Sequence, residues 1–129
     1  MLSDIERELA SLVNHARAQQ GLMPLRLDER LSDIARLKSQ DMINRQYFSH
    51  DSPVYGSPFD MLARFGLNYR RAGENIAMGQ QTAQRVINAW LKSQGHRENI
   101  LDPVYNTIGV GHAKDNLGSS YWTQLFAMK

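Results

Sequence analysis

Three short segments of this chain contain the residue types that can do chemistry. Phe48-Ser49-His50 and Gly95-His96-Arg97-Glu98 each supply an imidazole, and Gly73-Glu74-Asn75 supplies a carboxylate. Two imidazoles and a carboxylate can bind Zn²⁺ and leave one position open for water, as in catalytic zinc sites. The same groups can transfer protons, with Glu74 as the candidate general base. The sequence therefore makes His50, Glu74, His96 and Glu98 candidates for one polar cleft.

A purely structural interpretation of these residues stays open beside the functional one. Their wide spacing does not match a compact ligand motif such as H-E-x-x-H, which places two ligands on one helix face. A hydrogen-bonded His–Glu network that locks helices to a sheet would use the same residues. Glu74 is expected in the middle of a strand, where a carboxylate is costly unless it is solvated or paired. We therefore predict a partly buried Glu74 with a partner.

The elements that position these residues follow from hydrophobic periodicity, caps and breakers. A glycine inside a predicted strand indicates close approach of another backbone or a bulky side chain, and Gly109 and Gly111 are two such residues. Helices that precede a small antiparallel sheet, with one helix inserted, indicate an α+β layered domain over 1–129. The expected helices run from the Ser3–Glu6 capping box to Gly21, from Asp28 to near Tyr47, from Phe59 to Phe65 and from Thr82 to near Gly95, and the strands cover 71–78, 104–113 and 121–128.

This arrangement places His96 just after a helix end. A helix C-terminus favours a protonated imidazole by ~0.3–1 kcal/mol. His15 and His112 fit other roles, because the first lies on the polar side of a helix and the second on a strand face beside an apolar residue. Ser49 precedes His50 directly, but adjacent residues do not by themselves make a Ser–His pair. Core or gap-filling positions are expected for Trp90, Trp122, Met23, Met42, Met61 and Met78.

Composition excludes several classes of function. The 129 residues carry 15 basic and 13 acidic side chains, and no run of Lys/Arg favours nucleic-acid binding. The chain has no cysteine, which excludes disulfides, thiolate zinc sites and thiol nucleophiles. No apolar run approaches the ~20 residues of a membrane span. Met1-Leu2-Ser3-Asp4 does not begin a signal peptide, so the sequence predicts either a cytosolic protein or one whose signal segment lies outside it.

Several short motifs together resemble the CAP superfamily (cysteine-rich secretory proteins, antigen 5 and plant pathogenesis-related protein 1), also called the SCP domain, and its bacterial branch in particular. They occur in the family's order along almost the whole chain. They are Val13-Asn14-His15-Ala16-Arg17, Gly21-Leu22-Met23-Pro24-Leu25, Phe48-Ser49-His50, Gly73-Glu74-Asn75-Ile76-Ala77, Trp90-Leu91-Lys92-Ser93, Gly95-His96-Arg97-Glu98-Asn99-Ile100-Leu101, Ile108-Gly109-Val110-Gly111 and Tyr121-Trp122-Thr123-Gln124-Leu125-Phe126.

The resemblance implies a three-layer α-β-α sandwich with a three-stranded antiparallel sheet. It also implies a cleft in which eukaryotic members hold two His and two Glu and can bind a metal such as zinc. His50 and Glu74 match two of these positions, whereas Ser93 and Tyr121 stand where the second Glu and the second His are expected. The full eukaryotic site is therefore absent, and we predict that His96 faces the same cleft instead.

These observations lead to an expected function. We expect a secreted or cell-surface bacterial SCP domain, a monomer, that acts as a binding module for a metal ion, small ligand, lipid or cell-wall component. The alternative is a metal-assisted hydrolase or protease in which His50 and His96 hold zinc or another divalent metal. A third interpretation is that the residues only brace the domain. The predicted cleft residues are His50, Glu74, His96, Glu98 and Gln124.

Overall fold

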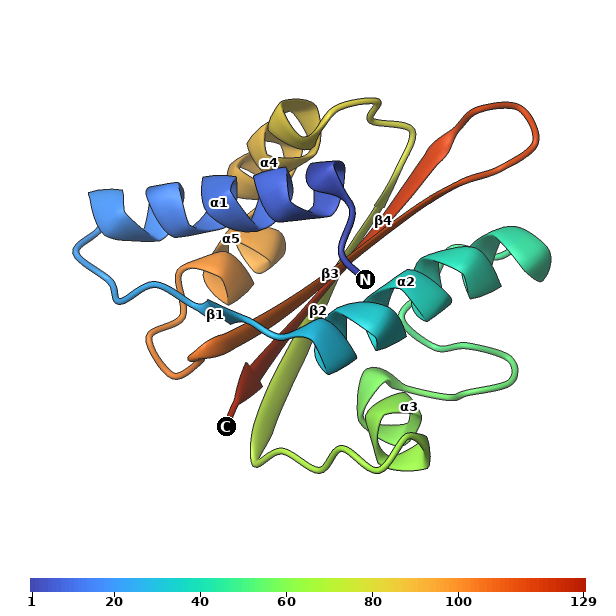
Figure 1. Cartoon of the computed structure of the whole chain (residues 1–129), viewed down its shortest axis with the longest axis horizontal. Helices are drawn as coiled ribbons and strands as arrows, with labels where there is room; N and C mark the ends of the chain where they lie inside the picture. Colours follow the sequence, from blue (N-terminus) through green and yellow to red (C-terminus); the bar gives the residue numbers. More distant parts are fainter.

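A computed structural model describes residues 1–129 as a central sheet between two helical layers (Figure 1). The helices are α1 (Asp4–Gln19), α2 (Glu29–Asn44), α3 (Pro58–Arg64), α4 (Ala83–Lys92) and α5 (Gln94–Ile100). The strands are β1 (Arg26–Leu27), β2 (Arg71–Met78), β3 (Thr107–Lys114) and β4 (Ser120–Met128). The predicted α+β three-layer class is confirmed.

The sheet has four strands in the order β1-β3-β4-β2, not the three that were predicted. β2, β3 and β4 pair antiparallel, and β1 adds a two-residue parallel pairing to β3. Two residues are too few to show an alternating hydrophobic pattern, so β1 leaves no signal in the sequence. It forms because the chain between α1 and α2 passes along the free edge of β3.

Alternation along β4 divides the core between the two faces of the sheet. Trp122 and Phe126 pack with α1, α4 and α5 in the larger cluster, whereas Leu125 and Ala127 pack with α2 and α3 in the smaller one. Figure 1 shows the same division, with α1, α4 and α5 on one side of the sheet and α2 and α3 on the other. The period of two in a strand produces this two-sided burial.

The two strand glycines lie directly beneath α2, which confirms the predicted close approach of another backbone. A Cβ atom at Gly111 would stand 2.0 Å from the amide nitrogen of Arg36, and one at Gly109 would stand 2.5 Å from the carbonyl carbon of Leu31. The absence of side chains at these positions brings the α2 backbone onto the sheet. The distance between α2 and β3 is therefore set by two glycines.

The third long helix ends earlier than the sequence predicted. α4 stops at Lys92, Ser93 is extended, and α5 begins at Gln94. His96 therefore lies in the first turn of a short helix and not after a helix C-terminus. The Ser3 capping box and the Asp28 and Thr82 caps are as predicted, and Ser57 with Asp60 forms a second capping box.

Candidate functional site

The structure joins His50 and Glu74 in one hydrogen-bonded pair. Nδ1 of His50 lies 2.7 Å from Oε1 of Glu74. The Glu74 side chain is 2% exposed, whereas the His50 side chain is 53% exposed. The buried carboxylate thus orients an imidazole that meets solvent, and the prediction of a partly buried Glu74 with a partner is confirmed.

The electrostatics of this pair follow from burial and from its hydrogen bond. The bond to Glu74 raises the pKa of His50, because the carboxylate stabilises the imidazolium. Burial raises the pKa of the Glu74 carboxyl, although His50 and Lys38 act in the opposite direction. With Nδ1–H donating to Glu74, Nε2 is the nitrogen of His50 that remains for a ligand.

Two residues of α2 hold the loop that carries His50. Lys38 donates from Nζ to the carbonyl oxygen of His50 at 3.0 Å. One turn further on, the Asp41 carboxylate accepts hydrogen bonds from the Ser52 hydroxyl at 2.7 Å and from the Tyr47 hydroxyl. The loop is therefore fixed on both sides of His50 by side chains of one helix.

Lys38 is the site residue that the sequence analysis missed. It is 1% exposed, which is unusual for lysine unless it is paired. Burial lowers the pKa of the Lys38 ammonium, and the nearby charge of Glu74 opposes that shift. A signal was present in the sequence, because Lys38 stands at helical spacing from the buried residues Leu31, Ile34 and Ala35 on the inward face of α2.

Asparagine side chains fix α5, which carries His96, to the sheet. Nδ2 of Asn75 donates to the carbonyl oxygen of His96 at 3.1 Å and to Oε1 of Gln124 at 3.2 Å. Nδ2 of Asn99 donates to Oδ1 of Asn75 at 2.9 Å. Gln124 is completely buried, and its Nε2 has no hydrogen-bond partner. Gln124 therefore supports the segment that carries His96 and does not line the cleft.

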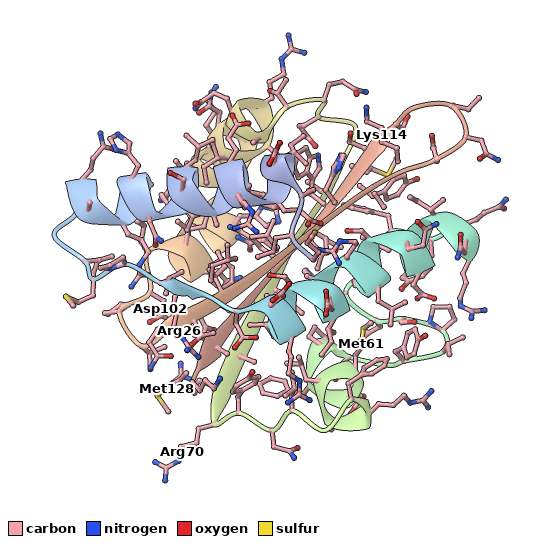
Figure 2. All side chains as sticks on the ribbon, viewed as in Figure 1. Arg26, Met61, Arg70, Asp102, Lys114 and Met128 are labelled. Carbon is pink, nitrogen blue, oxygen red and sulfur yellow. The ribbon has the colours of Figure 1, made fainter.

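His50 and His96 line one cavity of about 470 Å³, which we call the inner cavity. Its walls are otherwise mostly apolar, with Trp90 and Ile76 among them, and the hydroxyls of Ser49 and Ser93 add polar groups. His96 thus lies on the same cleft as His50. Figure 2 draws all side chains on the ribbon. The residues that line the inner cavity come from segments that are far apart in the sequence.

The protonation tendency of His96 is opposite to the one that the sequence predicted. Burial lowers the pKa of His96, and the positive charge of a protonated His50 lowers it further. The expected helix C-terminus is absent, because His96 lies in the first turn of α5, where the helix dipole disfavours a cation. The cavity therefore holds one imidazole whose pKa is raised and another whose pKa is lowered.

The remaining candidate residues lie outside the inner cavity. Glu98 is exposed on α5 and accepts a hydrogen bond from Nε2 of Gln94 at 3.0 Å. His15 is exposed, as expected, and Nε2 of His112 lies 2.8 Å from the Ser120 hydroxyl, which is a structural role. Met78 was expected to fill the core but is 48% exposed at the rim of the cavity. Met23 is also exposed, whereas Met42, Met61, Trp90 and Trp122 are buried as predicted.

The two residues that depart from the eukaryotic pattern lie in neighbouring hollows. Ser93 lines the inner cavity. Tyr121 lines a second hollow of about 670 Å³, which we call the outer groove. Phe48 and Met78 border both, so the two hollows adjoin.

The residues present do not form a preassembled zinc centre. No group of three or more His, Asp or Glu side chains is placed to hold a metal ion. Glu74 directs Oε1 to Nδ1 of His50, so its carboxylate acts on the imidazole. His50 and His96 remain two candidate ligands, and metal binding by them stays a prediction.

This chain belongs to the CAP, or cysteine-rich secretory protein, family, whose model matches residues 10–126. It is 52% identical over 128 residues to the uncharacterized protein YkwD of Bacillus subtilis. The matched region covers 99% of this chain and 49% of YkwD. It is 36% identical to the uncharacterized membrane protein YlbC of the same organism, over 94% of this chain and 34% of YlbC. The chain thus spans half or less of the length of these relatives.

Solved structures show the same fold. An extracellular SCP-domain protein from Bacillus anthracis matches with a TM-score of 0.90 and 35% identity, over 96% of this chain and 40% of that one. An outer surface protein from Borrelia burgdorferi matches with a TM-score of 0.87 and 22% identity, over 95% of this chain and 91% of that one, which supports the fold alone. The sequence-based assignment to the CAP superfamily is confirmed.

Proposed function

We propose that this CAP domain is an extracellular or cell-surface binding module whose inner cavity takes a small ligand with an oxygen acceptor group, a carboxylate above all. The observation that carries the proposal is the pair of His50 and Glu74 at the mouth of a mostly apolar cavity. An imidazolium that donates one N–H to Glu74 has its second N–H free to donate to a ligand.

The free N–H of a protonated His50 favours an acceptor group. Glu74 balances the charge of this imidazolium, and the buried ammonium of Lys38 lies behind them, with the Asp41 and Asp51 carboxylates nearby. The cavity walls formed by Trp90, Ile76 and Phe48 suit an apolar portion of the same ligand. A ligand with a carboxylate head and a short apolar tail matches both features.

The proposed location rests on the relatives. The Bacillus anthracis structure is described as extracellular and the Borrelia one as an outer surface protein. None of the helices has the length and apolar character that crossing a membrane requires.

The test uses hexanoate as the anionic probe and hexanol as its neutral control. We expect NMR titration with hexanoate to shift the imidazole signals of His50 and His96 to saturation, and hexanol to bind at least about tenfold more weakly. His50→Gln should abolish the effect, whereas His15→Gln, which changes an exposed histidine, should not. Equal binding of hexanoate by wild type and His50→Gln, or no shift at all, would refute the proposal.

A hydrolase is the second candidate function, favoured by one observation. A buried carboxylate that orients an imidazole over a cavity is the arrangement of a general base and its orienting group. Here His50 is the base and Glu74 orients it. In this function Nε2 of His50 would accept the proton of an attacking water or hydroxyl, and Glu74 would stabilise the imidazolium. Turnover of broad ester and peptide libraries that disappears in His50→Gln and is retained in His15→Gln would support it.

A further inference from the structure

We propose that the outer groove is a saccharide-binding extension of the inner cavity, so that the natural ligand is an oligosaccharide that runs across Phe48 and Met78, with its acceptor group at His50 and neutral sugar rings in the outer groove. This inference rests on the proposed binding function and names the class of its ligand. In this arrangement one acceptor oxygen of the oligosaccharide meets His50 and further sugar rings occupy the outer groove.

Continuity of the two hollows is the first support. Phe48 and Met78 border both the inner cavity and the outer groove, and each is 48% exposed. Exposed apolar side chains at such a boundary can contact a ligand, and no charged side chain has to lose its hydration when the ligand crosses them. A ligand longer than the inner cavity therefore continues into the outer groove.

The lining of the outer groove indicates the kind of ligand. Four carboxamide side chains line it, namely Gln40 and Asn44 on α2, Gln46 just after α2 and Asn116 in the β3–β4 turn. Nε2 of Gln40 donates to Oδ1 of Asn44 at 2.9 Å, which leaves Oε1 of Gln40 and Nδ2 of Asn44 for a ligand. Carboxamides donate and accept at once, as hydroxyl and acetamido groups of sugars require.

Aromatic faces complete the lining. Phe48, Tyr47 and Tyr121 border the groove. The flat apolar face of a sugar ring packs on an aromatic ring, while the ring edge carries the hydroxyls that reach the carboxamides. The combination of aromatic faces and carboxamides suits a pyranose ring better than a purely aliphatic chain.

Charge indicates that the oligosaccharide is neutral in this region. Lys114 and Asp115 are the only Lys, Arg, Asp or Glu side chains that line the groove, one of each sign. Figure 2 shows Lys114 at the end of the sheet opposite Arg26 and Arg70, so the arginines of that far end do not reach the groove. A polyanion would find no cluster of cations here.

The edge of the sheet disfavours a peptide ligand. An extended peptide commonly binds by adding a strand to a free sheet edge. β2 is an edge strand, but Asn99 donates to the carbonyl oxygen of Glu74 at 3.3 Å and Trp90 donates to that of Ile76 at 3.1 Å. Side chains thus occupy the acceptors that a peptide would need.

The test compares three probes by NMR titration: N-acetylglucosamine, its β-1,4-linked tetramer and a blocked tetraalanine. We expect the tetramer to shift signals of both hollows and to bind at least about tenfold more tightly than the monosaccharide, because only the tetramer fills both. Tetraalanine should not compete with it.

A matched pair of double variants isolates the outer groove. Gln40→Ala/Asn44→Ala removes two exposed carboxamides, and we expect it to weaken tetramer binding about fivefold or more without changing the response to hexanoate. Gln84→Ala/Asn88→Ala removes the same exposed pair from α4, where Nε2 of Gln84 donates to Oδ1 of Asn88 at 3.0 Å. This control should bind like the wild type.

The outcomes separate this inference from the proposed function. If hexanoate binds at His50 but the tetramer shifts no signal, the saccharide inference is overturned and the binding module stands. Tighter binding of tetraalanine than of the tetramer would overturn it in favour of a peptide groove. If neither hexanoate nor the tetramer binds, both proposals fall.

Discussion

The Lys38 ammonium donates to the main-chain oxygen of His50 over 3.0 Å from a side chain that is only 1% exposed. This contact links a helix in one layer to the loop that presents the imidazole. It also places a positive charge near Glu74, a buried carboxylate on β2. The position of His50 and the ionisation of its partner therefore depend on the same lysine.

Substitution of this lysine should destabilise the protein. Lys38→Met keeps the length of the side chain but leaves the Glu74 carboxylate without its buried countercharge, and we expect a loss of about 3 kcal/mol in the free energy of unfolding at pH 7. Urea denaturation measures it. Lys92→Met, at an exposed lysine of α4, should change the stability by less than about 0.5 kcal/mol. Equal stabilities of the two variants would contradict the role assigned to Lys38.

The two histidines should titrate on opposite sides of the ordinary value of 6.5. The bond to Glu74 raises the pKa of His50, and burial lowers the pKa of His96. Imidazole NMR titration measures both, and Glu74→Gln should lower the pKa of His50. A higher pKa for His96 than for His50 would contradict this arrangement.

The same shifts predict the pH dependence of stability. His50 has a raised folded pKa, so its contribution is complete below 6.5 and is lost as the pH rises through the folded pKa. His96 has a lowered folded pKa, so it destabilises the fold as the pH falls below 6.5. Urea denaturation from pH 5 to 9 gives the free energy of unfolding as a function of pH. Relative to the wild type, we expect the slope of this curve to change in opposite directions in His50→Gln and in His96→Gln.

Acid should weaken the link between α1 and α2. Burial tends to raise the pKa of Glu6, but the hydrogen bond of Arg36, at 2.6 Å, and two backbone amides outweigh it and lower this pKa below 4.5. A lowered folded pKa means that the stabilisation is present above 4.5 and is lost as the pH falls through the folded value. We expect Glu6→Gln to be less stable at neutral pH and to lose less stability in acid. A stability profile parallel to that of the wild type would contradict this.

Packing of α2 on the sheet should tolerate no side chain at Gly111. Gly111→Ala places a Cβ 2.0 Å from the Arg36 amide nitrogen, and we expect a loss of about 3 kcal/mol or more, because backbone cannot move aside cheaply. Gly95→Ala is the matched control, since nothing lies within 4 Å of its Cβ in α5, and it should stabilise by about 0.5–1 kcal/mol. Thermal denaturation of the two variants decides the matter.

Zinc binding, if His50 and His96 provide the ligands, should be weak. Two imidazoles supply fewer ligands than the three of a catalytic zinc site, and no third His, Asp or Glu joins them. We expect calorimetric titration with Zn²⁺ to give little heat in the wild type and none in His50→Ala/His96→Ala. Equal heats in both proteins would exclude a metal site at these histidines. Tight binding by the wild type that is lost in the variant would show that a further ligand moves into place when Zn²⁺ binds.

The sequence predicted those features that depend on local chemistry. Capping residues Ser3, Asp28 and Thr82 begin the helices where expected, and the strand over 71–78 matches β2. Their signals are short-range, because a cap or an alternating pattern is complete within a few residues. The close approach of another backbone at Gly109 and Gly111 was also predicted, and the α2 backbone lies there.

Partners that are far apart in the chain could not be predicted in the same way. The sequence predicted a partner for Glu74 but did not identify it as His50, and it placed the exposed Glu98 in the same cleft. Likewise the break at Ser93, which moves His96 from a helix end into a new helix, depends on how α4 and α5 pack. These choices are made by contacts between elements, which no window of sequence contains.

By itself, the sequence determined the family, the layered fold and three segments that could form a site, because motif order, caps and periodicity are properties of the chain. Only the tertiary structure decided that His50 and Glu74 pair, that His96 lines the same cavity and that Lys38 stands behind them. The physical reason is burial. The state of a charged side chain depends on which atoms surround it, and packing of α2 and α5 against the sheet supplies those atoms.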